Sequence, residues 1–336
     1  MNSSVYEDMD VKISVIMSVY NTKEEYLREA IDSILNQTFT AYEFIIIDDC
    51  CNHDTKEILE SYHDDRIILV KNEENIGLTA SLNIGLDLAK GKYIARMDSD
   101  DISMPDRLRD QYQYMEKHAD VDILGGWFKA GNKIEKSLGR VSKERRRVRM
   151  LFENAGVCHS AAFIRKDFLE ENNLNYDINM KKAQDYDLWS RCLDVGRMEV
   201  LPKIVLEYRV HNDQISIRNS SEQNYYIKLI RKSRLNKIYS DYTERELEQF
   251  LNMDNEILSS KELDEFFMTI LKKNKENNFF NNKILKYELS KEWLKIIFGK
   301  YHRKNKREFF WMKRTLVMFS PVFWSYFLFN QVLRRI

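Results

Sequence analysis

Short apolar runs alternate with amphipathic stretches over the first hundred residues of the chain. The runs are rich in β-branched side chains and predict buried strands at residues 11–19, 44–47, 67–70 and 93–97. The intervening stretches carry apolar residues at helical spacing and predict helices at residues 23–36, 55–62 and 78–89. Strands and helices that alternate at this distance predict right-handed βαβ units, and therefore a parallel sheet.

Polar residues follow each of these four predicted strands. They are Tyr20-Asn21, Asp48-Asp49, the loop 72–77 and the acidic stretch 98–101. Because ligands of parallel α/β sheets bind beyond the carboxyl ends of the strands, four such ends predict a ligand crevice. The sequence has no Gly-x-Gly-x-x-Gly after its first strand and no P-loop lysine, which argues against a dinucleotide site or a P-loop.

Asp98, Asp100 and Asp101 place three carboxylates directly after the predicted strand 93–97. Buried carboxylates repel one another and are costly to desolvate unless a cation lies among them. Oxygen ligands favour Mg²⁺ or Mn²⁺, which commonly also hold substrate phosphates. The alternative is a solvated acidic turn before the helix that begins at Pro105. The other three polar strand ends favour the metal site.

Residues 102–218 repeat the alternation less regularly. They predict a helix at 105–118 and strands at 121–128, 156–164 and 203–210. Asp185 lies near the N-terminus of a further predicted helix, where the helix dipole favours a carboxylate, so capping is one reading of it. Arginines between residues 143 and 152 predict a solvated helix face. His211 follows a predicted strand, and a lone histidine is usually structural or exposed.

Composition narrows the class of protein. The chain has 53 basic and 53 acidic residues, so its zero net charge gives no reason to expect a nucleic-acid partner. Its four cysteines lack the spacing of a zinc site, and we expect a reduced, cytoplasmic protein. Residues 1–10 are polar and acidic, unlike a signal peptide.

The character of the chain changes after residue 218. Residues 219–297 mix charged residues with apolar residues at helical spacing and predict a helical extension. Residues 298–336 combine clustered lysines and arginines with many aromatic residues. Such a tail can lie in a membrane interface, or it can form a helical cap on the folded protein.

Several motifs together resemble family 2 glycosyltransferases. They include VIMSVYN at 15–21, IIIDD at 45–49 and ARMDSDD at 95–101, and the likeness continues to His211. The resemblance implies the GT-A fold, an α/β architecture with a Rossmann-like, mostly parallel central sheet flanked by helices. It assigns residues 11–218 to this domain, with a nucleotide-binding half at 11–101 and an acceptor-binding half at 102–218.

The resemblance also implies roles for individual residues. Asp100 and Asp98 would hold Mn²⁺ or Mg²⁺ with His211 as a third ligand, Asp49 would pair with the uracil N–H, and Asp185 would be the catalytic base. The residues implied to bind the nucleotide sugar are Val19, Tyr20, Asn21, Asp48, Asp49, Asn75, Gly77, Arg96, Asp98 and Ser99. Two positions depart from the family pattern, since Gln184 replaces the usual Glu before the base and Cys50-Cys51 replaces Gly-Ser.

The resulting expectation is an inverting hexosyl- or N-acetylhexosaminyltransferase. It would move a sugar from a UDP-sugar to a hydroxyl of a lipid-linked glycan in bacterial O-antigen, capsule or exopolysaccharide synthesis, at the cytoplasmic face of the inner membrane. A sugar-nucleotide nucleotidyltransferase is an alternative, but it calls for a Gly-rich basic loop that Ser18–Lys23 does not supply. A non-catalytic nucleotide- or carbohydrate-binding module is another, although such a module has no need of Asp185.

Overall fold

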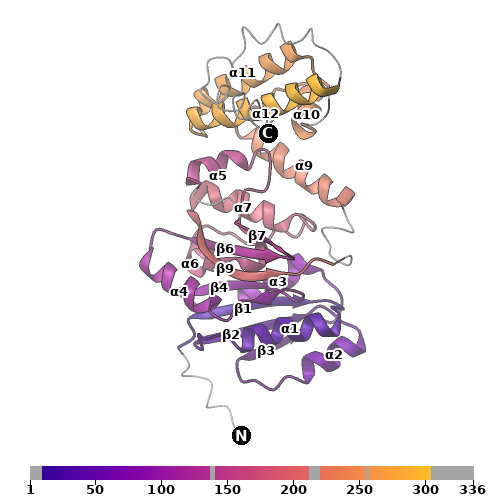
Figure 1. Cartoon of the computed structure of the whole chain (residues 1–336), viewed down its shortest axis with the longest axis vertical. Helices are drawn as coiled ribbons and strands as arrows, with labels where there is room; N and C mark the ends of the chain where they lie inside the picture. The colour runs from indigo at the N-terminus through magenta and orange to yellow at the C-terminus, as the bar shows by residue number, and fades with distance from the viewer. Residues whose placement is uncertain (1–9, 137–140, 212–219, 254, 256, 304–336) are drawn as a thin grey trace. The chain divides into compact units, whose positions relative to one another are not determined.

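The chain folds into two compact units. The computed structural model describes residues 10–136, 141–211, 220–253, 255 and 257–303. The first unit is formed by residues up to Lys143 together with Asn154–Tyr226, and the second by Glu144–Glu153 and the chain from Ile227 onward (Figure 1). Almost all of the predicted N-terminal segment 1–10 and of the predicted tail 298–336 lies outside the described residues, so both remain predictions.

A nine-stranded mixed sheet forms the centre of the first unit, in the order β3-β2-β1-β4-β8-β6-β9-β5, with β7 paired to β6 (Figure 1). The strands are β1 (Ile13–Val19), β2 (Tyr42–Asp48), β3 (Ile67–Lys71), β4 (Tyr93–Asp98), β5 (Ile102–Ser103), β6 (Ile123–Ala130), β7 (Lys133–Glu135), β8 (Phe163–Arg165) and β9 (Met198–Tyr208). Strands β3, β2, β1 and β4 are parallel, as predicted, whereas β8 is antiparallel to both of its neighbours.

Helices cover both faces of the parallel half of this sheet. The first unit contains α1 (Glu24–Leu35), α2 (His53–Glu60), α3 (Leu78–Leu88), α4 (Arg107–Lys117), the 3₁₀ helix η1 (His159–Ala161), α6 (Lys166–Glu171) and α7 (Gln184–Val195). Side chains from α1, α2 and α4 pack with Val15, Met17 and the other strand residues of one face. Ile16 points to the opposite face and approaches Gly85 of α3. This alternation is the two-residue period of a strand that is buried on both sides.

The register of the parallel strands brings the predicted site residues to one edge. Val19 of β1 lies opposite Asp48 of β2, and Ser18 lies opposite Asp98 of β4. The three strands therefore end at the same level, and the residues that follow them share one edge of the sheet.

The prediction of a strand over residues 156–164 is wrong for most of that segment. Only Phe163–Arg165 pairs with β4, and η1 precedes it. Two contacts hold the earlier residues away from the sheet edge. Gly156 packs against Trp189 of α7, and the Ser160 hydroxyl donates to Asp101.

The prediction of a solvated arginine face over residues 143–152 is also wrong. These residues form α5 (Lys143–Arg149), and within the second unit Arg146 is only 1% exposed. Arg145 forms an ion pair with the buried Glu288, and Arg147 Nη1 donates to the Phe279 carbonyl oxygen at 2.6 Å. A planar guanidinium can serve as a buried donor to several acceptors, which helical spacing alone does not reveal.

The remaining helices are α9 (Ser220–Asn236), α10 (Glu244–Leu251), α11 (Ser260–Asn277) and α12 (Asn282–Arg303). Capping boxes start α10 and α11, at Thr243 with Glu246 and at Ser259 with Glu262. Within the second unit, Arg231 of α9 donates to the carbonyl oxygens of Leu151, Phe250 and Leu251 and so ties α9 to the end of α10. Among the helices that the structure describes, none is long and apolar enough to cross a membrane.

Candidate active site

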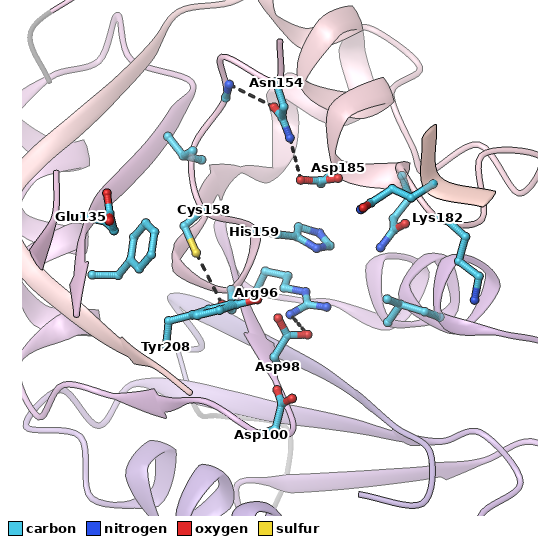
Figure 2. Close-up of a pocket in the computed structure, with 17 residues that line it drawn as sticks. Arg96, Asp98, Asp100, Glu135, Asn154, Cys158, His159, Lys182, Asp185 and Tyr208 are labelled. Atoms are coloured by element: carbon cyan, nitrogen blue, oxygen red, sulfur yellow. Dashed lines mark hydrogen bonds and ion pairs between the residues drawn. The ribbon is translucent and has the colours of Figure 1, made fainter. Parts of the chain in front are cut away.

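A pocket of about 600 Å³ opens in the first unit, at the ends of β4 and β9 and the start of α7 (Figure 2). Its walls include the predicted residues Arg96, Asp98, Asp100 and Asp185. The structure therefore brings the acidic strand end and the predicted base into one cavity, although 85 positions separate Asp100 from Asp185 in the sequence.

The acidic cluster consists of Asp98, Asp100 and Asp101. One carboxylate oxygen of each lies within 4.8 Å of those of the other two. Burial and then the negative charge of Asp98 raise the pKa of Asp100, and the same two causes raise that of Asp101 to about 8. Like charges held this close favour a bound cation, and carboxylate oxygens suit Mn²⁺ or Mg²⁺.

The three acids have different surroundings. Asp98 forms an ion pair with Arg96. Asp100 Oδ2 lies 2.9 Å from His211 Nε2, so the predicted third ligand does reach the acidic strand end. Asp101 is wholly buried and accepts hydrogen bonds from the Ser160 hydroxyl and, at 3.0 Å, from the backbone N–H of Arg209. Asp101 therefore fastens the ends of β4 and β9 together, while Asp98 and Asp100 face the pocket.

A second group of side chains holds His211 in place. The Arg209 guanidinium lies 4.3 Å from the ring centroid of Tyr26, and the Tyr26 and His211 rings are 5.0 Å apart. Arg209 also donates to the backbone oxygen of Asp100 at 2.8 Å and pairs with Glu29 of α1. The stacked cation and ring fix the chain after β9 against α1.

Arg96 is a buried cation between the acids and the base. Its side chain comes from β4, two residues before Asp98 and on the same face of the strand, and the residue is 2% exposed. Burial lowers the pKa of Arg96, but the charge of Asp98 outweighs this and leaves the pKa above its usual value. Its Nε atom has no hydrogen-bond partner among the described residues. A buried donor without a partner is costly. The Nε–H of Arg96 is therefore suited to donate a hydrogen bond to a ligand oxygen.

The predicted nucleotide-binding residues are joined by hydrogen bonds at the neighbouring strand ends. Asp49 Oδ1 accepts from Asn72 Nδ2 and the Ile76 N–H, and Asp49 Oδ2 accepts from the Gly77 N–H, each at 2.9 Å. Gly77 has a φ of +85°, which an L side chain would strain. A carboxylate oxygen can accept two hydrogen bonds, so Oδ2 of Asp49 keeps one site for a further donor.

Asn21, Asn75 and Ser99 complete this arrangement. Asn21 Oδ1 accepts from the Asn52 N–H at 2.7 Å, and Asn75 Nδ2 donates to the Asp49 backbone oxygen at 3.2 Å. The Ser99 and Thr22 hydroxyls are 2.6 Å apart, which links the end of β4 to the loop after β1. The predicted residues that line these strand ends are Val19, Tyr20, Asn21, Asp48, Asp49, Asn75, Gly77 and Ser99.

Asp185 is the second residue of α7, at the helix end where its carboxylate is favoured by free N–H groups. Burial raises its pKa, while the Tyr186 N–H, the Asn154 side chain and Arg96 act in the opposite direction. Asn154 Nδ2 donates to Asp185 Oδ2 at 2.8 Å (Figure 2). A carboxylate whose pKa is raised by burial but held down by hydrogen bonds and a nearby cation is a suitable general base near neutral pH.

His159 forms the pocket wall between Asp185 and Arg96 (Figure 2). Its Nε2 atom lies 2.8 Å from the Tyr176 hydroxyl. Burial and then the positive charge of Arg96 hold the pKa of His159 well below its ordinary value, so this imidazole is neutral. Tyr176 and Asn154 were not identified from the sequence, because no local pattern links them to the acids that they approach. His159 and Arg209 lie within the stretch that resembles the family, but the sequence assigned them no role.

Comparisons with known proteins give the family of the chain and agree with its fold. The family model described as glycosyl transferase family 2 matches residues 14–172. An uncharacterised glycosyltransferase of Methanocaldococcus jannaschii is 35% identical over 239 residues, which cover 69% of this chain and 77% of that protein. The O-antigen biosynthesis glycosyltransferase WbnJ of Escherichia coli is 33% identical over 209 residues, covering 60% of this chain and 80% of WbnJ.

Solved structures share the architecture. The structure of S. aureus TarS 1–349 in complex with UDP-GlcNAc matches with a TM-score of 0.60 and 19% sequence identity, over 87% of this chain and 92% of that chain. The predicted GT-A fold with C-terminal helices is thereby confirmed. The chain is a glycosyltransferase that belongs to glycosyl transferase family 2 and is similar to enzymes of polysaccharide biosynthesis.

Proposed function

We propose that this glycosyltransferase is inverting and metal-dependent and moves a sugar from a UDP-sugar to a hydroxyl of a glycan acceptor. One observation carries the proposal: Asp98, Asp100 and Asp185 line the same pocket. A metal-dependent inverting transfer uses a cation site for the departing diphosphate and one base on the acceptor side, and these residues would supply both.

Asp98, Asp100 and His211 would hold Mn²⁺ or Mg²⁺. When bound, this ion would act as a Lewis acid that neutralises the charge on the leaving diphosphate. Arg96, which carries a buried and partner-free Nε, would donate to an oxygen of the donor. Asp98 already pairs with Arg96, so Arg96 also sets the position of that carboxylate.

The nucleoside would bind at the ends of β1 and β2. The free acceptor site on Asp49 Oδ2 suits the imide N–H of uracil, while Asp48, Asn21, Asn75 and the Gly77 turn shape the surrounding loop. Tyr20 is 55% exposed directly after β1 and offers an aromatic face to a base. These assignments make UDP-sugars the first donors to test.

Asp185 would accept the proton of the acceptor hydroxyl as its oxygen attacks the anomeric carbon. The raised pKa of Asp185 improves it as a base, while the helix N–H and the Asn154 amide keep it ionised. The attack comes from the face opposite the departing diphosphate, so the anomeric configuration inverts. A hexose or an N-acetylhexosamine would be the transferred sugar.

The acceptor would be a lipid-linked oligosaccharide of a bacterial surface polysaccharide, handled at the cytoplasmic face of the inner membrane. The names of relatives such as WbnJ, an O-antigen enzyme, and TuaG, a putative teichuronic acid enzyme of Bacillus subtilis, support this choice. The basic aromatic composition of residues 298–336 supports a peripheral membrane contact. A truncation after Arg303 should leave the membrane fraction more readily than the full chain, and equal partitioning of the two would refute this contact.

The proposal is tested by a UDP-release screen of common UDP-sugars with Mn²⁺. We expect turnover with one donor and a loss of about 10²-fold to 10⁴-fold in Asp185→Asn, the range for removal of a general base. Calorimetry of UDP binding serves as the control, because Asp185→Asn should leave UDP affinity unchanged. Near-normal turnover in this variant would remove Asp185 from the role of base.

A further inference from the structure

Asn154 and the proposed base Asp185 both line the pocket and are joined by a hydrogen bond. Asn154 Nδ2 donates to Asp185 Oδ2 at 2.8 Å, and the two residues are 31 positions apart in the chain (Figure 2). Among the described residues, no other side chain bonds to the Asp185 carboxylate. A hydrogen bond to an ionised acceptor is stronger and more directional than one between neutral groups.

The local backbone sets the orientation of the Asn154 amide. The Gly156 N–H donates to Asn154 Oδ1 at 3.1 Å, so the carbonyl side of the amide is fixed by its own loop. The NH₂ side must then face Asp185, which resolves the usual ambiguity between the two ends of an asparagine side chain.

The loop that carries Asn154 is itself held against α7. A Cβ on Gly156 would lie 2.1 Å from Cδ1 of Trp189, which is wholly buried one helical turn after Asp185. Only glycine permits this approach, and the approach places residue 154 beside the first turn of α7.

Gln184 gives a reason why such support matters in this chain. Gln184 precedes the proposed base, and its buried Oε1, an acceptor, has no hydrogen-bond partner among the described residues. Among the same residues, no hydrogen bond joins the Gln184 side chain to the Asp185 carboxylate. Asn154, brought in from a distant loop, provides the side-chain hydrogen bond instead.

We propose that Asn154 is a positioning residue for Asp185: it holds one carboxylate oxygen and thereby fixes the rotation of the carboxylate that presents the other oxygen to the acceptor hydroxyl. This inference rests on the proposed role of Asp185 as the base. Asn154 does not itself contact the reacting atoms. It acts by restricting the base to one geometry and by favouring its ionised form.

Other charged and titratable groups face Asp185 from neighbouring elements. Arg96 comes from β4, His159 from η1, and Tyr176 and Lys182 from the segment before α7. Arg96 favours the ionised carboxylate from a distance, His159 is neutral, and burial keeps the Tyr176 hydroxyl protonated by raising its pKa. Among these groups and Asn154, only Asn154 donates a hydrogen bond to the carboxylate, at 2.8 Å.

The test compares Asn154→Ala and the isosteric Asn154→Asp with the wild type. Removal of the donor should lower kcat about tenfold and move the acid limb of the kcat profile up by about one pH unit. Asn154→Asp places a second carboxylate beside the base and should move the limb further in the same direction. Both variants should keep the donor KM of the wild type within about twofold, because Asn154 does not bind the nucleotide.

Asn172→Ala is the matched control. Asn172 is an exposed asparagine in the same unit, and its Nδ2 donates to the Phe168 backbone oxygen at 2.9 Å. This variant should show the wild-type pH profile. A direct measurement that does not depend on turnover is the pKa of Asp185 from ¹³C-carboxyl NMR, with the signal assigned by its loss in Asp185→Asn.

The outcomes separate the two ideas. An Asp185 pKa and a pH profile that stay at the wild-type values in both Asn154 variants, with Asp185→Asn inactive, would overturn the role of Asn154 alone. A drop in thermal stability without a shift of the Asp185 pKa or of the acid limb of the kcat profile would mark Asn154 as merely structural. That result would also overturn the positioning role. Turnover in Asp185→Asn would instead refute the proposed base.

Discussion

Substitution of Gly156 by alanine tests how closely the loop 154–156 must approach α7. The new Cβ would lie 2.1 Å from Cδ1, 2.6 Å from Cγ and 3.0 Å from Cβ of Trp189. Carbon atoms in contact normally lie about 3.5 Å or more apart, so the loop must move by roughly 1.5 Å. Trp189 cannot swing aside, because its own Cβ is among the atoms approached and the residue is wholly buried.

This displacement should affect both stability and catalysis. Overpacking of this kind costs about 1–3 kcal/mol in the free energy of unfolding. Because the Gly156 N–H orients Asn154, a shift of the loop also weakens the bond from Asn154 to Asp185. A misplacement of about 1 Å can cost up to about 10²-fold in rate, so we expect kcat to fall by about 10-fold to 100-fold.

The free energy of unfolding is measured by urea denaturation, and kcat is measured separately from UDP release at saturating donor. Gly131→Ala is the matched control, since Gly131 has a φ of +55° but open space around its missing Cβ. That variant should lose only about 1 kcal/mol in the free energy of unfolding, the cost of left-handed backbone strain, and should keep the wild-type kcat. Wild-type kcat and stability in Gly156→Ala would refute the argument from close packing.

Three further predictions concern the metal site, the base and the second unit. Asp100→Ala should abolish the Mn²⁺ dependence of UDP binding in calorimetry, and an unchanged response to Mn²⁺ would remove Asp100 from the metal site. Because burial raises the pKa of Asp185 above 3.8 and the reaction needs the ionised form, activity should be lost as pH falls through a value above 3.8; a kcat/KM profile flat down to pH 4 would contradict this. Arg231→Met leaves three backbone oxygens of the second unit without their donor and should cost about 3 kcal/mol in urea denaturation, whereas Lys232→Met, at an exposed neighbour, should cost less than about 0.5 kcal/mol.

The parallel half of the sheet could be predicted from the sequence because its signals are local. The runs that became β1 to β4 are continuous and β-branched, and the helices between them show clear apolar spacing. The antiparallel half was harder to predict. Residues 156–162 are as apolar as a strand, but Gly156 and Ser160 are held by Trp189 and Asp101, which lie far away in the chain.

The arginines of α5 make the same point about burial. Charged residues at helical spacing usually face solvent, and nothing near them in the sequence indicates otherwise. Their partners are Glu288 of α12 and Phe279 of the connection between α11 and α12, more than 130 residues later. Only the packing of the second unit makes these side chains buried hydrogen-bond donors.

The sequence by itself determined the order of strands and helices through β4, the acidic strand end at Asp98–Asp101 and the family. These features depend on residue spacing and on motifs that are contiguous in the chain. The tertiary structure decided that Asp100 meets His211, that Asp101 fastens β4 to β9, and that Asn154 holds Asp185. Each of these is a contact between residues that are 31 or more positions apart, and such contacts form only once the elements have packed together.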